Sequence, residues 1–255
     1  MKKLSWHYKK LIFKFKKKID LDKDLLSSNN LNELFNHYGS DKGTMVNHPY
    51  GREEEKIVGH GFGDYYEKYF KNLRNENFNL LEIGTWKGAS LAAFKKYFLK
   101  AYIYGLDRNF KFQYKSDKIR FYNCDTTKKS DLQIIEKKFE NKKFKIIIDD
   151  GSHFLNDIIS NLRFFFRFLD KKGIYVIEDF RHPEYYKFLD DSKKKELNVT
   201  EIIEKFKKKE FFQSELLTKD DQLILMKNIK IISSYKGIKK DKDINVSDIA
   251  FIEKN

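Results

Sequence analysis

The stretch FKIIIDDGSHF (residues 144–154) leads an aliphatic run into two aspartates, a glycine, a serine and a histidine. A second aliphatic run, GIYVIEDF (173–180), ends in Glu178 and Asp179. Carboxylate oxygens are the ligands that Mg²⁺ and Mn²⁺ prefer, whereas zinc prefers nitrogen and sulfur. A cation would also offset the repulsion between crowded acids. We therefore expect Asp150, Glu178 and Asp179 to share Mg²⁺ or Mn²⁺.

His153 lies three residues after Asp150 and is expected to face the same edge. A neutral imidazole there can take a proton from a substrate hydroxyl whose acidity a metal has raised. A lone histidine is more often a helix cap or a surface residue. The three candidate ligands beside it favour the catalytic interpretation, so His153 and Asp150 are the candidate catalytic residues.

A glycine loop, EIGTWKG (82–88), follows an earlier aliphatic run. Gly84 permits close backbone approach, and Gly88 permits a helix start whose free N–H groups can meet a ligand. Asp107 lies 23 residues beyond Gly84, the spacing at which a carboxylate accepts both hydroxyls of an adenosine ribose. Asp125 is then placed to reach the adenine edge. The plain alternative is that the glycines only shape a turn and the acids only cap helices.

These residues need a sheet to position them. From residue 79 onward, short aliphatic runs alternate with longer amphipathic segments, which is typical of βαβ units. The sequence predicts an α/β, Rossmann-like fold with a mostly parallel seven-stranded sheet, helices on both faces and a C-terminal antiparallel hairpin. The expected parallel strands are 80–85, 101–107, 119–125, 144–150 and 173–180, with later helices near 201–212 and 220–230.

Ligands bind beyond the carboxyl ends of such strands. Each polar cluster lies at one of these ends, so seven carboxylates are expected on one rim: Glu82, Asp107, Asp125, Asp149, Asp150, Glu178 and Asp179. The polar stretch from Arg181 to Thr200 is expected to shape the substrate side.

Bulk properties limit the partners. A chain of 255 residues with 40% hydrophobic and 16% aromatic residues suits one folded domain. The formal charge of +14 invites nucleic acid or an anionic membrane as partner. However, 52 basic residues less seven arginines leaves 45 lysines, whereas nucleic-acid recognition favours the planar fork of arginine. We expect no nucleic-acid partner. Cys124 is the single cysteine, so no internal disulfide can form and a cytoplasmic setting is expected.

The chain divides into three predicted parts. Residues 1–30 form a basic amphipathic N-terminal segment, 31–78 a helical and loop cap that carries GSDKGT, and 79–255 the main domain. No run of about 18 apolar residues occurs, which excludes a spanning helix, and no secretory signal is recognisable. Residues 1–20 either lie on an anionic surface, peripheral to the inner membrane, or dock their aromatic side on the domain.

The E-x-G-x-x-x-G loop and the acids ending the next two strands resemble class I S-adenosylmethionine-dependent methyltransferases over 79–255. DDGSH followed by YVIEDF, with HYGSDKGT (37–44) and GHGFGDYYEKYF (59–70), resembles the metal-dependent O-methyltransferases of macrolide sugars and surface glycans. Trp86 departs from the glycine that many members have there.

The resemblance implies S-adenosyl-L-methionine as cofactor, Asp150, Glu178 and Asp179 as ligands of Mg²⁺ or Mn²⁺, and His153 as base. The cofactor-binding residues that it implies are Ser40, Lys42, Glu82, Gly84, Thr85, Gly88, Asp107, Arg108, Asp125 and Asp149. The substrate mouth would be lined by Tyr65, Tyr66 and His182.

The leading hypothesis is therefore methyl transfer to a sugar hydroxyl, with a nucleotide-activated sugar or a capsular or lipopolysaccharide unit, such as a heptose, as acceptor. Relatives with these motifs often assemble, so a homo-oligomer is also expected. The alternatives are a nucleic-acid methyltransferase, a hydroxylase of the antibiotic-tailoring type on the same scaffold, and a non-catalytic membrane-associated scaffold. DDGSH at the fourth strand argues against base methylation, which usually uses Asn or Asp followed by two prolines and an aromatic residue.

Overall fold

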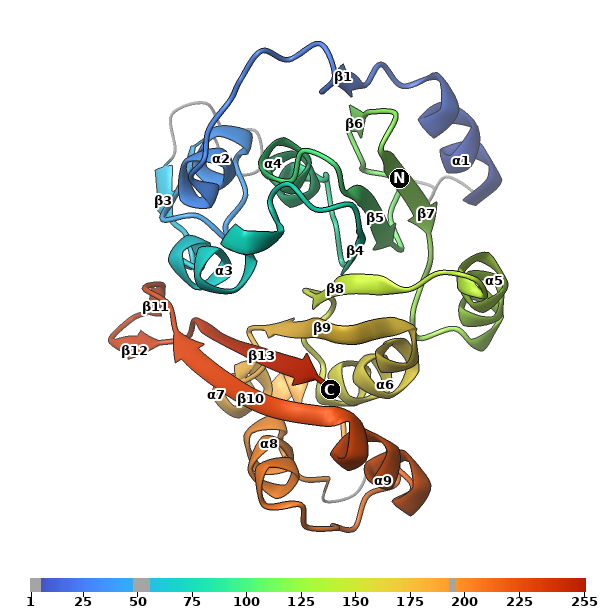
Figure 1. The fold of residues 1–255 in the computed structure, drawn as a ribbon, viewed down its shortest axis with the longest axis vertical. Coiled ribbons are helices and arrows are strands. Elements are labelled where there is room, and N and C mark those ends of the chain that lie inside the picture. The colour runs from blue at the N-terminus through green and yellow to red at the C-terminus, as the bar shows by residue number, and fades with distance from the viewer. Residues whose placement is uncertain (1–5, 48–55, 193–195) are drawn as a thin grey trace.

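The computed structural model describes residues 6–47, 56–192 and 196–255. Its centre is a seven-stranded sheet in the order β10-β13-β9-β8-β4-β5-β7 (Figure 1). The parallel strands are β4 (Asn79–Ile83), β5 (Tyr102–Asp107), β7 (Ile119–Asn123), β8 (Phe144–Asp149) and β9 (Leu169–Glu178). The antiparallel strands β13 (Asp248–Lys254) and β10 (Ile229–Lys236) complete the sheet beyond β9. The predicted fold class is confirmed, including the C-terminal antiparallel pair.

Helices cover both faces of this sheet, because successive strand residues point to opposite sides. Leu80, Ile146 and Ile148 pack with helices on one face, namely α2 (Leu31–Tyr38), α3 (Gly63–Phe70) and α4 (Ala89–Tyr97). Leu81 and Ile147 face the other side, where they pack with α5 (Lys129–Phe139), α6 (Leu155–Phe165), α8 (Val199–Lys208) and α9 (Lys219–Asn228). The two apolar cores hold the strand ends in fixed positions.

Shorter elements complete the chain. The two-residue or three-residue strands pair as β1 (Ile19–Asp20) with β6 (Tyr114–Lys115), β2 (Met45–Asn47) with β3 (Lys56–Val58), and β11 (Lys240–Asp241) with β12 (Ile244–Asn245). Short helical turns form at η2 (Lys71–Leu73), η3 (Phe166–Phe168), α7 (His182–Tyr185) and η4 (Lys187–Leu189). The predicted polar stretch after residue 180 thus contains two helical turns. The last predicted helix ends at Asn228, earlier than expected, because β10 begins at Ile229.

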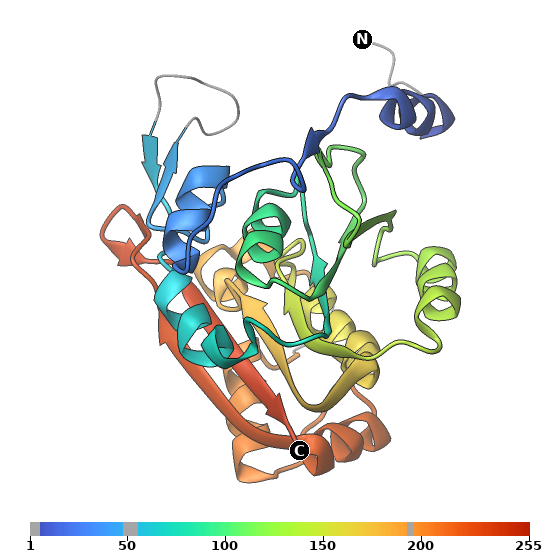
Figure 2. The same ribbon diagram turned by 45° about the horizontal axis from the view of Figure 1, so that its top comes forward.

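The N-terminal helix α1 (Trp6–Phe15) lies at the periphery, beyond the edge strand β7 (Figures 1 and 2). Its Trp6 and Phe13 rings contact Phe110, so the expected docking of an aromatic side on the domain is present. Across the described residues, no helix is both long and apolar enough to span a bilayer.

Candidate active site

A cavity of about 730 Å³ opens at the carboxyl ends of β4, β5 and β8, where ligands bind in parallel α/β sheets. Its size suits a cofactor or small substrate. Eight of the predicted site residues line it: Ser40, Lys42, Gly84, Thr85, Asp107, Arg108, Asp125 and Asp150. Segments far apart in the sequence, including the cap residues before the first sheet strand, therefore meet at one place.

The glycine loop has the close backbone approach that was predicted. Gly84 has φ of 88°, and a Cβ there would lie 1.9 Å from the backbone oxygen of Asp150. Only glycine fits this crossing of the loops after β4 and β8. Gly88, with φ of 89°, precedes the first residue of α4 as predicted, but it shapes the turn and does not line the cavity.

Asp107 fastens the loop to the end of β5. Its two carboxylate oxygens accept backbone N–H groups from Trp86, at 2.7 Å, and Asn109, at 2.6 Å. Trp86 adopts φ of 48°, a left-handed conformation in which glycine is usual. A glycine, which many members of the resembling family have at this position, would adopt this conformation without strain. Burial raises the pKa of Asp107.

Thr85 supplies a free polar group on the cavity wall. Its Oγ1 is buried and has no hydrogen-bond partner among the residues that the structure describes. A buried hydroxyl without a partner is costly unless a ligand or water satisfies it. This unsatisfied hydroxyl lies beside the cavity but below its accessible surface.

Lys42 connects the cavity to three acids. Its ammonium lies 2.5 Å from Asp150 Oδ2, 2.9 Å from Glu178 Oε2 and 3.4 Å from Glu82 Oε1, and its side chain is only 1% exposed. Burial alone would lower the pKa of Lys42, but the neighbouring carboxylates, Asp150 first, raise it well above its usual value. An internal cation thus occupies the position between Asp150 and Glu178, two of the three predicted metal ligands.

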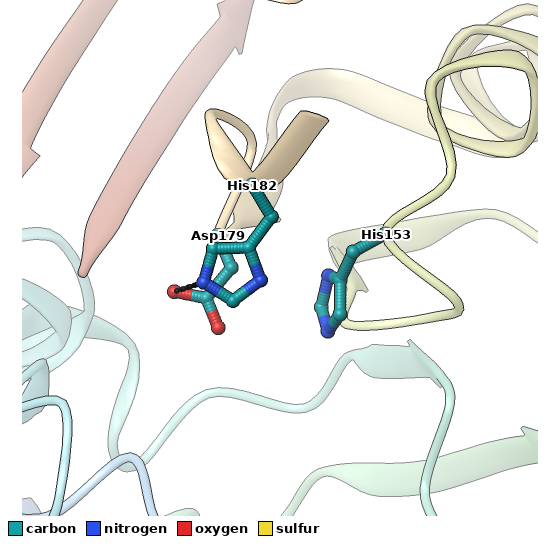
Figure 3. A group of neighbouring side chains, drawn as sticks. All are labelled: His153, Asp179 and His182. Atoms are coloured by element: carbon teal, nitrogen blue, oxygen red, sulfur yellow. Dashed lines mark ion pairs between the residues drawn. The ribbon is translucent and has the colours of Figure 1, made fainter. Parts of the chain in front are cut away.

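Asp179, the third predicted ligand, belongs to a different group. Its Oδ1 lies 3.0 Å from Nδ1 of His60 and 3.6 Å from Nε2 of His182. His153, Asp179 and His182 each offer one ligand atom within 4.8 Å of the others (Figure 3). The rings of His153 and His182 meet edge to face, with centroids 5.1 Å apart and an interplanar angle of 72°. Asp150 stays close to this group, because its Oδ1 lies 3.6 Å from Nε2 of His153.

The protonation of this group suits a cation. Burial would raise the pKa of Asp179, but His60, His153 and His182 together outweigh burial, and the pKa is lowered to about 2. Burial lowers the pKa of His182 to about 4. At neutral pH Asp179 is therefore ionised and His182 is neutral, which are the forms that bind metals.

Two residues of this group adopt unusual backbone conformations. His153 has φ of 59° and Asp179 has φ of 50°. Left-handed conformations are strained for residues other than glycine, and such strain gathers at functional sites. His153 lies two residues before α6, which begins at Leu155, so it lies on a loop and not on the helix itself.

The seven carboxylates do not all line the cavity. Asp107, Asp125 and Asp150 line the cavity, whereas Glu82, Asp149, Glu178 and Asp179 do not. Glu82 is fully buried, where it accepts a hydrogen bond from Ser90 and lies 3.4 Å from the Lys42 ammonium, and both of these residues line the cavity. Consecutive strand residues point to opposite faces, so the strand positions before Asp150 could not all face the same space.

Asp149 was predicted to bind the cofactor, and the structure corrects this. It is 3% exposed and accepts hydrogen bonds from Asn161, at 3.2 Å, and Tyr175, at 3.5 Å, inside the core. Burial raises the pKa of Asp149 to about 8. The folded protein therefore holds a proton here that the unfolded chain releases above its ordinary pKa near 4.

Asp149→Asn is expected to remove this pH dependence. A raised carboxyl pKa means that the folded state binds the extra proton, so stability present at pH 4 is lost as the pH rises towards 8. The Asn variant should lose less stability between pH 5 and pH 8 than the wild type, by at least about 1 kcal/mol. Urea unfolding at both pH values measures the difference, with the exposed Asp243→Asn as control. Parallel losses in wild type and Asp149→Asn would contradict the assignment.

The predicted substrate tyrosines lie elsewhere. Tyr66 is fully buried and its hydroxyl donates to Glu178 Oε1, so it supports that carboxylate and does not line a mouth. Tyr65 stacks on Tyr235, with centroids 4.6 Å apart, outside the cavity wall. His182 joins the Asp179 group, and its Nε2 lies 3.0 Å from the backbone oxygen of Val246.

Two further residues were missed by the sequence analysis. His60 contacts Asp179, and it lies in the GHGF segment that carries the family resemblance. Asn161, in α6, donates a hydrogen bond to Asp149, and no feature of the sequence around Asn161 predicts this contact.

No family model matches the chain. Among curated proteins it is 33% identical over 127 residues to the mycinamicin VI 2''-O-methyltransferase of Micromonospora griseorubida, covering 47% of this chain and 31% of that protein. It is 32% identical over 127 residues to the demethylmacrocin O-methyltransferase of Streptomyces fradiae, covering 47% and 32%. The chain thus spans about a third of the length of these relatives.

Among solved structures the chain is similar to the MycE methyltransferase from the mycinamycin biosynthetic pathway, in complex with Mg, SAH and mycinamycin VI. The TM-score is 0.63 at 22% identity, covering 88% of this chain and 54% of that one. The chain therefore has the class I S-adenosylmethionine-dependent methyltransferase fold, and the curated relatives that it matches are named as O-methyltransferases.

Proposed function

We propose that this chain is an S-adenosylmethionine-dependent, divalent-metal-dependent O-methyltransferase that acts on a sugar hydroxyl. One observation carries the proposal: the cavity bounded by the glycine loop and Asp107 is joined, through Asp150, to a cluster of carboxylates and imidazoles. The first part fits a nucleoside with a reactive methyl group, and the second fits a hydroxyl that must lose a proton. The relatives named as O-methyltransferases support the reaction type.

Each part of the site has a role in this proposal. Asp107 and Asp125 accept hydrogen bonds from polar groups of the nucleoside. His153 takes the proton of the acceptor hydroxyl. The sulfonium cofactor supplies an electrophilic methyl group, so the protein mainly has to align the acceptor oxygen with it.

The residues present fit a divalent cation on two grounds. Asp150 and Glu178 already surround a positive charge, and the ligand atom of Asp179 lies within 4.8 Å of those of His153 and His182. Mg²⁺ or Mn²⁺ held by Asp150, Glu178 and Asp179 would take over the charge that Lys42 now provides. Such a cation makes an acceptor hydroxyl more acidic.

The group of His153, Asp179 and His182 favours a second candidate function. Two histidines and one carboxylate with open positions are the ligand set of non-haem iron oxygenases. A hydroxylase on the same scaffold therefore remains the alternative to test. It would require Fe(II) and would consume oxygen, whereas methyl transfer requires neither.

The acceptor can be narrowed by experiment. The named relatives act on glycosylated antibiotics, and we propose a sugar acceptor for this chain too. A nucleotide-activated sugar or a capsular or lipopolysaccharide unit, including heptoses, belongs in the acceptor panel. The excess of lysine over arginine favours a compact anionic group such as a diphosphate over nucleic acid.

The test is transfer of a labelled methyl group from S-adenosylmethionine to this panel, with Mg²⁺, Mn²⁺, Fe(II) or excess chelator. We expect labelled sugar with Mg²⁺ or Mn²⁺ and a large loss with chelator. Full activity after exhaustive chelation would overturn the metal role. Oxygen consumption that depends on Fe(II), with no methyl transfer to any acceptor, would favour the hydroxylase.

A further inference from the structure

Helix α1 uses one side to dock on the domain. The indole nitrogen of Trp6 donates a hydrogen bond to Asn123 Oδ1 at 3.1 Å. Phe13 contacts Phe110 and Phe121, with ring centroids 5.4 Å apart in both pairs. These contacts fix the helix against the loop after β5 and the edge strand β7, and therefore fix which side of α1 points away from the domain.

The side that points away is apolar. At about 100° per residue, Leu11, Ile12 and Phe15 lie on the side of the helix opposite Trp6 and Phe13. Their exposed fractions are 53%, 48% and 82%. Single exposed apolar residues are common, but three on one face of a ten-residue helix form a patch. The domain does not need these side chains for its own packing.

The surroundings of this patch are strongly basic. Helix α1 contains no acidic residue, and exposed lysines occur within it or directly after it: Lys9, Lys10, Lys14, Lys16 and Lys17. A second copy of the chain bound at this patch would bring its own lysines against the lysines of the first copy, and like charges oppose such pairing. Nucleic acid would use the lysines but leave the apolar patch in water. An anionic bilayer surface satisfies both features, because its headgroups attract lysine and its acyl boundary accepts apolar side chains.

We propose that α1 binds the chain to an anionic lipid surface, with Leu11, Ile12 and Phe15 entering the interface and the flanking lysines contacting the headgroups. The helix lies in the membrane plane and does not cross it. Because Trp6 and Phe13 remain docked, the whole domain is held at the surface in one orientation. This surface is separate from the cavity and does not depend on the proposed reaction.

The test is flotation of the purified full chain with vesicles of phosphatidylcholine alone or mixed with phosphatidylglycerol. We expect binding to the mixed vesicles only, weakened by salt because the attraction is partly electrostatic. The double variant Ile12→Ser/Phe15→Ser should bind at least about tenfold more weakly, since the apolar area that enters the interface is lost. The matched control is Ile134→Ser/Phe188→Ser, whose side chains are 55% and 73% exposed elsewhere; it should bind like the wild type.

Three outcomes would overturn the proposal. The first is absence of wild-type binding to the mixed vesicles. The second is equal binding by the wild type and Ile12→Ser/Phe15→Ser, which would mean adsorption through lysines alone. The third is a sedimentation result in which the patch holds two copies of the chain together and vesicles do not separate the two copies. Circular dichroism of both double variants checks that folding is intact, so that a loss of binding can be assigned to the patch.

Discussion

Lys42→Met is expected to lower the free energy of unfolding by about 3–5 kcal/mol, the usual cost of removing one partner from a buried ion pair. The variant keeps an apolar stem of similar length but leaves Asp150 and Glu178 buried without their cation. Mg²⁺ or Mn²⁺ should then stabilise Lys42→Met more than it stabilises the wild type, because the metal no longer has to displace an ammonium. Saturating metal, at about 100 times its Kd, would restore about 2.7 kcal/mol.

Urea unfolding with and without metal measures both effects. The control is Lys128→Met, which removes the 3.1 Å ion pair of an exposed lysine with Asp125 and should leave stability unchanged. Equal stabilisation of wild type and Lys42→Met by metal would contradict a cation site at Asp150 and Glu178. It would instead place the metal at His153, Asp179 and His182.

His153→Asn is expected to lower kcat for methyl transfer by about 10²–10⁴, the usual contribution of a positioned general base. Asparagine is chosen because it tolerates the left-handed conformation that His153 adopts, so the loop before α6 should keep its shape. Affinity for S-adenosylhomocysteine should stay unchanged, since His153 does not line the cavity. Single-turnover transfer to the best acceptor of the panel measures the loss.

His182→Asn separates a base from a metal ligand. If His153 acts as base only and neither imidazole binds the metal, metal affinity should be the same in both variants. His153→Asn alone should then show the large fall in kcat. If both imidazoles bind the metal, calorimetry should show weaker metal binding in both. Full activity of His153→Asn would exclude His153 both as the base and as a metal ligand.

The sheet could be predicted because its signal is local. Aliphatic runs such as 144–149 are too short for helices and are separated by amphipathic segments, so β4, β5, β7, β8 and β9 follow from pattern alone. The positions of Gly84, Asp107 and Asp125 follow in turn, because parallel strands end at the same edge. The alternation of side chains along a strand also predicts that Asp149 and Asp150 point in opposite directions, so that both cannot face the cavity.

The contacts of Lys42 could not be predicted in the same way. It joins Asp150 and Glu178 across 108 and 136 residues, from a turn that belongs to no strand of the central sheet. The same holds for His60, which reaches Asp179 from the cap. A carboxylate cluster in a sequence predicts that a positive charge is needed. It does not tell whether a metal or a lysine from a distant segment supplies that charge.

The most direct test of the central claim is isothermal titration of S-adenosylhomocysteine into the wild type and Asp107→Ala. The account predicts that the wild type binds and that Asp107→Ala binds about 10-fold to 150-fold more weakly, because a charged hydrogen-bond acceptor is worth about 1.5–3 kcal/mol. Circular dichroism should show that the variant is folded, since Asp107 also holds the backbone of Trp86 and Asn109. A folded wild type that does not bind S-adenosylhomocysteine at all would contradict the assignment of the cavity to a methyl-donor cofactor.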